Sequence, residues 1–204
     1  KGVTFTLTDC NGSGNGKGIV TRDSGQNGRG VYVAGGVFYM YGGTISGNSA
    51  KVGDPVYGGG VYVEGSTKNS GTVGTFHMYA GAISDNTAYN SKGNSGGAGV
   101  YVGEGAAFYL HDGSISGNRV LKSAGSSSGG GVYVGSKGTF VFEKGSVSYN
   151  YADNGGGIFV DTDGVFTMAS GIIGGSAEDA ANTAKFGGGV YTKGDCTMSG
   201  DAAV

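Results

Sequence analysis

Apolar and polar positions alternate in short blocks along this chain. A block has either an aromatic residue between two valines, as in Val31, Tyr32 and Val33, or two large apolar residues two positions apart, as in Phe38 and Met40. A period of two is the pattern of a β-strand with one buried face. The chain is therefore predicted to form many short strands, with the valines, Phe38 and Met40 pointing inward and the intervening tyrosines pointing outward.

Three such blocks recur in a fixed order along almost the whole chain. The first block opens at Val31, Val61, Val100, Val132, Ile158 and Val190, at spacings of 30, 39, 32, 26 and 32 residues. The second block comprises the pairs Phe38-Met40, Phe76-Met78, Phe108-Leu110, Phe140-Phe142, Phe166-Met168 and Cys196-Met198. The third is centred on Ile45, Ile83, Ile115, Val147 and Ile173, and an incomplete copy with Phe5 and Leu7 precedes the series.

One repeat of this kind cannot bury its own apolar face, whereas stacked repeats bury it in continuous columns. The repeats predict an all-β right-handed parallel β-helix, a solenoid of about six turns with three short strands each. Residues 1–204 form a single domain in this interpretation. At a strand separation of about 4.8 Å, six turns give a rod of roughly 29 Å.

The ends of the chain suggest a piece of a longer solenoid. The last turn is predicted to stop after Met198 without a cap, and the chain opens at Lys1 rather than at a methionine. An uncapped solenoid end exposes unpaired strand edges. We therefore expect flanking repeats to continue the rod end to end.

Asparagine and glycine recur beside the strand blocks. Three residues after each third-block residue come Asn48, Asn86, Asn118, Asn150 and finally Ser176. Stacked asparagines can hydrogen-bond along a solenoid and satisfy backbone groups at a turn. Glycine runs before the first block, such as residues 58–60 and 129–131, predict tight corners.

Composition removes several classes of protein. With 48 glycines but no Gly-X-Y period the chain is not collagen, and 37% hydrophobic residues are too many for a disordered linker. A net charge of -2 gives no basic patch for nucleic acid, and no apolar run reaches the length of a membrane span.

Cys10 and Cys196 lie several turns apart, so no intrachain disulfide is expected. Cys196 falls in a core column, where a small buried apolar residue is expected.

One polar cluster invites a catalytic interpretation. Positions following the second block place His111 beside Glu143, and Asp112 beside Lys144, in adjacent turns. Two solvated ion pairs are the favoured interpretation, because no further carboxylate completes an acid–base pair. The alternative is the site of a polysaccharide lyase or hydrolase. No catalytic residue, cofactor or metal site is predicted.

Asp161 and Asp163 could contribute to a cation site or to a turn. Two carboxylates from one turn fall short of the six or more oxygens that calcium takes. Aspartate is common in turns at strand ends, so the turn is favoured.

An outward aromatic column supplies the candidate binding residues: Tyr32, Tyr62, Tyr101, Tyr133, Phe159 and Tyr191. Exposed aromatic rows can stack on sugar rings or contact a partner protein. The alternatives are an aromatic stack internal to the rod and cover by folded-back loops. Residues 65–74, 90–97 and 122–129 form variable loops, which are either recognition elements or flexible spacers.

The repeats resemble those of bacterial surface adhesins. Gly-Gly-Gly-Val-Tyr-Val at 58–63 and 129–134, and Ile-Ser-Gly-Asn at 45–48 and 115–118, are similar to the Gly-Gly-Ala-Ile and Phe-x-x-Asn repeats of chlamydial polymorphic outer-membrane proteins. Isoleucine usually stands here where that family has phenylalanine. The resemblance covers nearly the whole chain and implies secretion, a position at the bacterial cell surface and attachment to a host or matrix. No catalytic residues carry over.

The sequence thus predicts a non-enzymatic segment of a bacterial adhesin or passenger domain, outside the cell or at its surface. Its partner would be a glycan or an extracellular protein, or the segment would serve as a stalk. A polysaccharide-degrading enzyme fragment is the alternative. An ice-binding role is disfavoured because it needs a regular threonine array, and the relevant column is mixed: Tyr39, His77, Tyr109, Val141, Thr167 and Thr197.

Overall fold

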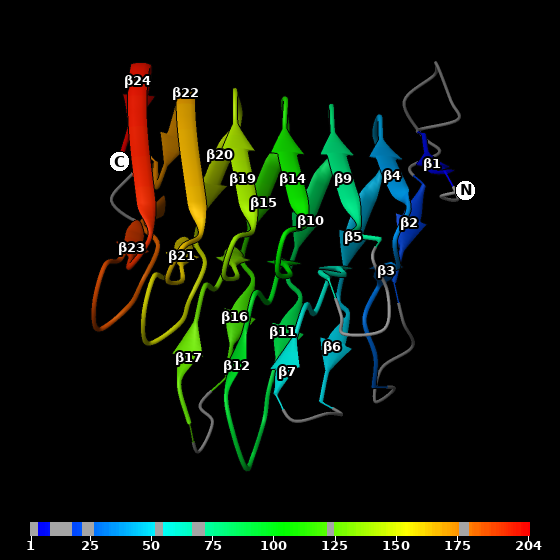
Figure 1. The fold of residues 1–204 in the computed structure, drawn as a ribbon, viewed down its shortest axis with the longest axis horizontal. Helices are drawn as coiled ribbons and strands as arrows, with labels where there is room; N and C mark the ends of the chain where they lie inside the picture. The colour runs from blue at the N-terminus through cyan, green and yellow to red at the C-terminus, as the bar shows by residue number, and fades with distance from the viewer. Residues whose placement is uncertain are drawn as a thin grey trace.

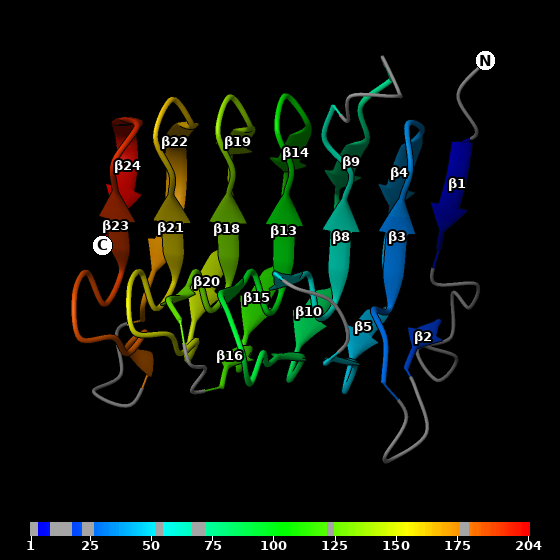
Figure 2. The same cartoon turned by 60° about the horizontal axis from the view of Figure 1, so that its bottom comes forward.

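Strands of successive turns pair in parallel along the whole rod. The computed structural model describes residues 4–8, 18–21, 27–51, 55–66, 72–121, 125–175 and 180–204. Figure 1 shows the turns advancing from the blue N-terminal end to the red C-terminal end. In Figure 2 the chain ascends front strands such as β13, β18 and β21, turns over the top and descends behind them, which is a right-handed path. The predicted parallel β-helix is confirmed.

The first-block strands form one six-stranded sheet in the predicted register. Val31, Val61 and Val100 lie opposite one another, and the tyrosine after each valine faces the tyrosine of the next turn. Valine side chains enter the core because alternate residues of a strand point to opposite faces. The strands are β3 (Val31–Val33), β8 (Val61–Val63), β13 (Val100–Val102), β18 (Val132–Val134), β21 (Ile158–Val160) and β23 (Val190–Thr192).

Second-block strands form a seven-membered parallel stack. Phe5 pairs with Phe38 and Leu7 with Met40, which confirms the incomplete first copy. The strands are β1 (Thr4–Leu7), β4 (Val37–Met40), β9 (Thr75–Met78), β14 (Ala107–Leu110), β19 (Thr139–Phe142), β22 (Val165–Ile173) and β24 (Asp195–Ala203). Third-block strands continue each turn: β2 (Ile19–Val20), β5 (Thr44–Ser46), β10 (Ala82–Ser84), β15 (Ser114–Ser116) and β20 (Ser146–Ser148).

Three strands per turn proved too few for the central turns. Two further three-stranded stacks follow the asparagine corner, where the sequence analysis placed only loops: β6 (Ser49–Ala50), β11 (Thr87–Ala88) and β16 (Arg119–Val120), then β7 (Val56–Tyr57), β12 (Ser95–Gly96) and β17 (Ser127–Ser128). Ala88 and Val120 of these strands form a second core with Ala98 and Ala152. Two-residue strands with alanine or serine carry too weak a pattern to predict.

The last turn extends further than predicted. β24 continues past Met198, and Ala202 and Ala203 pair with Gly171 and Ile172 of β22. The prediction of a stop after Met198 was wrong because one extra residue forms a bulge, with Gly200 at a φ of 61°.

Cys196 corrects a second expectation at this end. It occupies the predicted column, opposite Phe166, but it is exposed rather than buried. No strand among the described residues covers this last turn, which leaves the thiol in contact with solvent. Cys10 lies outside the described residues, so the expectation about a disulfide is not addressed by the structure.

The asparagine ladder forms as predicted, with one change of member. The side chains of Asn48, Asn86, Asn118 and Asn150 are buried, and each backbone N–H donates to the side-chain oxygen of the next asparagine at 3.0–3.1 Å. The last acceptor is Asn182, not Ser176, which lies outside the described residues. The longer final corner shifts this role six residues along the chain.

Glycine is required where two turns touch at the corners. Gly129 has a φ of 63°, in the left-handed region that favours glycine. A Cβ on Gly130 would lie 2.4 Å from the carbonyl oxygen of Gly156 and 2.6 Å from the nitrogen of Tyr151. The glycine corners thus bring the first-block sheet close to the asparagine ladder.

Candidate functional site

The predicted aromatic column lies on the outer face of the first-block sheet, but its cover changes along the rod. Tyr32 is 51% exposed, whereas Tyr133 and Phe159 are only 8% and 4% exposed. Tyr62, Tyr101 and Tyr191 are intermediate. The column is therefore open near the N-terminus and covered in the fourth and fifth turns.

Neighbouring rings of this column stack on one another. Their centroids are 4.8–5.5 Å apart, and their planes differ by 2–34°. Most ring faces are thus occupied by the next ring, which leaves edges and hydroxyl groups for a ligand. Both alternatives weighed from the sequence, a stack internal to the rod and cover by loops, are present in part.

Arg29 and Glu64 hold the open end of the column. The Arg29 guanidinium lies 4.5 Å from the centroid of the Tyr62 ring, and its Nε donates to the carbonyl of Tyr57 at 2.8 Å. The Tyr32 hydroxyl donates to Glu64 at 2.9 Å. Partial burial and this carboxylate raise the pKa of Tyr32 to about 12. The rings at this end are therefore held by two neighbours of opposite charge, Arg29 and Glu64.

Tyr57 of β7 covers the middle of the column. Its ring lies 4.4 Å from that of Tyr101 and 5.1 Å from that of Tyr133, centroid to centroid. Gly96 of β12 makes room in the same region, because a Cβ there would lie 2.7 Å from the Tyr133 ring. The unpredicted stack of β7, β12 and β17 thus forms a wall facing the aromatic column.

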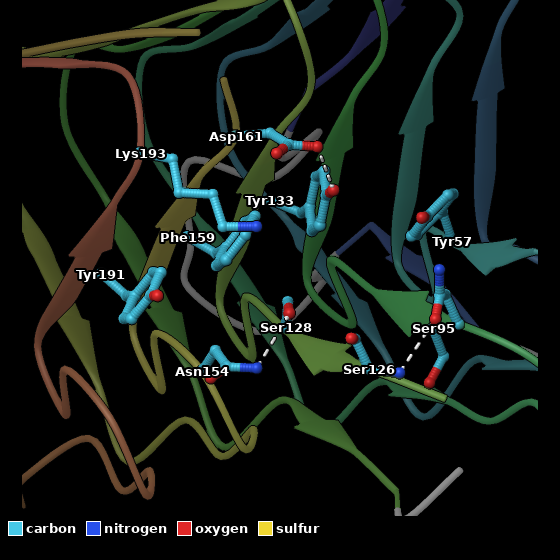
Figure 3. Close-up of a pocket in the computed structure, with 11 residues that line it drawn as sticks. Tyr57, Ser95, Ser126, Ser128, Tyr133, Asn154, Phe159, Asp161, Tyr191 and Lys193 are labelled. Atoms are coloured by element: carbon cyan, nitrogen blue, oxygen red, sulfur yellow. Dashed lines mark hydrogen bonds between the residues drawn. The ribbon is translucent and has the colours of Figure 1, made fainter. Parts of the chain in front are cut away.

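A groove of about 190 Å³ opens between this wall and the later part of the column. Figure 3 shows Tyr133, Phe159 and Tyr191 above Ser128 and Asn154, with Tyr57 at one end. The remaining lining residues are Asn94, Ser95, Ser126, Asp161 and Lys193. Aromatic edges, amides, hydroxyls and two charged groups thus line one concave site, which is typical of sites for polar ligands with some apolar surface.

Two side chains set the charge of the groove. Asp161 accepts hydrogen bonds from the Tyr133 hydroxyl at 2.8 Å and from the backbone N–H of Thr162 at 2.9 Å. The Lys193 ammonium lies 5.4 Å from the centroid of the Phe159 ring. Burial raises the pKa of Tyr133, and so do Tyr57 and Asp161. The Tyr133 hydroxyl therefore stays protonated and donates to Asp161 at physiological pH.

Three of the six predicted binding residues line the groove, namely Tyr133, Phe159 and Tyr191. Tyr32, Tyr62 and Tyr101 lie outside it, although Tyr101 contacts Tyr57 at its end. The polar lining residues were not among the predicted binding residues, although Asp161 was considered for a cation site or a turn. The variable segments 90–97 and 122–129, singled out as possible recognition elements, contribute four of them: Asn94, Ser95, Ser126 and Ser128.

The charged cluster on the second-block sheet forms the predicted cross-turn pairs. His111 Nδ1 lies 2.8 Å from Glu143 Oε2, and Lys144 Nζ lies 2.8 Å from Asp112 Oδ2. A further contact was not predicted: His77 Nδ1 lies 3.0 Å from His111 Nε2. A neutral His111 that donates from Nδ1 to Glu143 accepts from His77 Nδ1 at its Nε2, whereas a protonated His111 donates from both ring nitrogens.

Rings enclose these histidines. His77 stacks on Tyr109 at 4.6 Å and His111 on Tyr79 at 4.2 Å, centroid to centroid. Burial lowers the pKa of His77, as does the neighbouring His111. The carboxylates of Asp112 and Glu143 are each bonded to a different basic partner.

Asp161 and Asp163 take part in a turn, as favoured from the sequence. Residues 162 and 163 form the turn, and Asp163 has a φ of 60°. Across the described residues, no group of three or more His, Cys, Asp or Glu side chains is arranged to hold a metal ion. In the same residues, no helix has the length and apolarity needed to cross a membrane.

Comparison of the chain with protein-family models, with curated proteins and with solved structures finds no match.

Proposed function

We propose that this chain is a non-enzymatic segment of a bacterial cell-surface adhesin or passenger rod, and that it binds a glycan in the groove between β17 and the aromatic column. The observation that carries the proposal is the groove lining. Ring edges of Phe159 and Tyr191 lie beside the amide of Asn154 and the charged groups of Asp161 and Lys193. Sugars present both C–H surface and hydroxyl groups, and such a lining matches both.

The repeat pattern supports the location. Its resemblance to adhesin repeats implies a rod outside the cell, and a side groove on a rod is accessible to a polymer lying along it. Recognition by loops beside a rigid scaffold is also the usual arrangement in solenoid proteins.

The test is binding of the purified monomeric chain to an array of glycans and matrix proteins, with two matched variants. Tyr191→Ala removes a ring that lines the groove, and Tyr41→Ala removes a 49% exposed ring on the opposite sheet. We expect saturable glycan binding that Tyr191→Ala weakens by up to about tenfold, in line with one aromatic contact. The Tyr41→Ala variant should bind as the wild type does.

Other outcomes reject parts of the proposal. If both variants lose the same amount of glycan affinity, the groove is not the binding site. If the chain binds matrix proteins and no glycan, the ligand is a protein. If no partner binds, the chain is a stalk. The Tyr62→Ala, Tyr101→Ala double variant tests the part of the column outside the groove.

One observation favours the alternative of a polysaccharide lyase or hydrolase. Glu143 contacts one ring nitrogen of His111 and His77 contacts the other, which holds the imidazole in one orientation, as in sites that orient a base. The test is release of reducing or unsaturated ends from polysaccharides by the wild type and by His111→Ala. Release that is lost in the variant would establish the enzyme and reject the non-enzymatic proposal.

A further inference from the structure

The charge of the groove bears on which glycan it takes. We infer, resting on the proposed glycan site, that the groove selects acidic glycans and that Lys193 determines this specificity by binding a sugar carboxylate beside Phe159.

Lys193 differs from Lys137, Lys144 and Lys185 in lacking a carboxylate partner among the described residues, as Lys51 and Lys92 also do. Lys137, Lys144 and Lys185 each pair with an acidic side chain at 2.8–3.1 Å. Within the described residues, the Lys193 ammonium makes no such pair, although Asp161 lines the same groove. Its three N–H donors thus face the groove without an anionic neighbour in contact.

Asp161 is already engaged by the protein. One of its oxygens accepts from Tyr133 and the other from the Thr162 N–H. Two hydrogen bonds hold this carboxylate at the groove wall and reduce its capacity for further donors. The Lys193 ammonium, by contrast, has no such partner among the described residues, so it is the charged group of the groove with donors to offer a ligand.

The aromatic rings that line the groove also favour an anionic ligand. Tyr133, Phe159 and Tyr191 stack face to face, so the groove meets their edges. Ring edges carry partial positive charge, whereas ring faces carry partial negative charge. An anionic group next to Phe159 is thus favoured by the ring edge as well as by Lys193.

These features define one orientation for a bound uronic acid unit. Its carboxylate lies beside Lys193 and the edge of Phe159, and its hydroxyls face Asn154 and Ser128 on the opposite wall. Asn154 has donor capacity for this, since its Nδ2 makes only long contacts of 3.5 Å to Ser127 O and Ser128 Oγ.

The experiment measures the affinity of the chain for oligogalacturonate and for hyaluronan oligosaccharides, each against its carboxyl-reduced neutral counterpart. Reduction keeps the linkages and ring hydroxyls and removes only the charge. Lys193→Gln is compared with Lys144→Gln, which removes the same charge on the other sheet, and with Lys193→Arg, which retains a cation.

We expect the wild type to bind at least one acidic oligomer up to about fivefold more tightly than its reduced form, the upper end for one exposed ion pair. Lys193→Gln should remove most of this preference without weakening binding of the reduced form. Lys144→Gln and Lys193→Arg should keep the preference. Raising salt from about 0.05 M to about 0.5 M should weaken acidic binding alone.

The outcomes separate this inference from the proposed function. Binding of neutral and acidic oligomers with equal affinity, or equal effects of Lys193→Gln and Lys144→Gln, would overturn the acidic preference and leave the groove as a glycan site. If neither oligomer binds the wild type, the inference fails. Loss of all array binding would instead reject the proposed function.

Discussion

Asn118 is the residue whose removal should damage the rod most for its size. It lies in the middle of the ladder and is fully buried. Its side-chain oxygen accepts the backbone N–H of Asn86 at 3.1 Å. Its Nδ2 donates to the carbonyls of Ile83 and Ser116 and to the side-chain oxygen of Asn150, at 2.9–3.1 Å.

The cost of Asn118→Ala follows from these bonds. The Asn86 N–H loses its acceptor at a site without solvent, which costs about 1–3 kcal/mol. The two N–H groups of Nδ2 are shared among three acceptors, and losing them adds about 0.5–1.5 kcal/mol for each of the two donors. We therefore expect the free energy of unfolding to fall by about 3–5 kcal/mol.

Urea denaturation followed by circular dichroism and tyrosine fluorescence measures this loss, with coincident transitions as the check on two-state behaviour. Asn94→Ala is the matched control. Asn94 also accepts a backbone N–H one turn on, from Ser126 at 2.9 Å, but the contact is exposed, so water can replace it. The control should lose less than about 1 kcal/mol. A loss for Asn118→Ala that is no larger than for Asn94→Ala would refute the reasoning.

Three further changes probe the corners, the core and the histidines. Gly130→Ala places a Cβ 2.4 Å from a backbone oxygen and should lower the free energy of unfolding by more than about 3 kcal/mol. Gly174→Ala, at a φ of 107° but in open space, should lower it by about 1–2 kcal/mol. Equal losses in denaturation experiments would contradict the steric explanation. Phe108→Ala removes a fully buried ring and should lower the free energy of unfolding by about 3–5 kcal/mol. Tyr109→Ala, at the adjacent outward position, should lower it by clearly less. A larger loss for Tyr109→Ala would mean that the core lies on the other face of this strand. Because the pKa of His77 is lowered in the folded chain, the unfolded chain takes up this proton first as pH falls below about 6.5. The free energy of unfolding should therefore decrease from about pH 7 to pH 5, and His77→Gln should reduce this pH dependence. An NMR titration midpoint of His77 above about 6.5 would contradict the prediction.

The sequence was sufficient for the rod but not for the groove. Large apolar residues at a period of two placed Phe38, Phe76 and Phe108 in one column, because only stacked turns can bury such blocks. Turn-to-turn register followed from the same blocks, since a slip by one residue would expose every apolar side chain.

The groove depends on features with little sequence signal. Its wall is made by two-residue strands such as Ser95–Gly96 and Ser127–Ser128, whose side chains do not alternate in hydropathy. Tyr57 stacks on Tyr101 of a later turn, and Gly96 leaves space for the Tyr133 ring, and both approaches are set by tertiary packing. Asn182 was not predicted as a member of the ladder, because its distance along the chain from the preceding third-block strand differs from that of the other asparagines.

The parallel pairing of successive turns has a mechanical consequence. Strands lie across the rod, so the hydrogen bonds between turns run along its axis and each turn is held only by its neighbours. Tension applied through the chain ends would therefore detach one terminal turn at a time instead of shearing the whole rod. With 26–39 residues between successive first-block strands, each detachment releases about 90–140 Å of extended chain, against roughly 5 Å of rod lost. A tether built this way would lengthen in unequal steps under load, and the order of the step sizes would record the order of the turns.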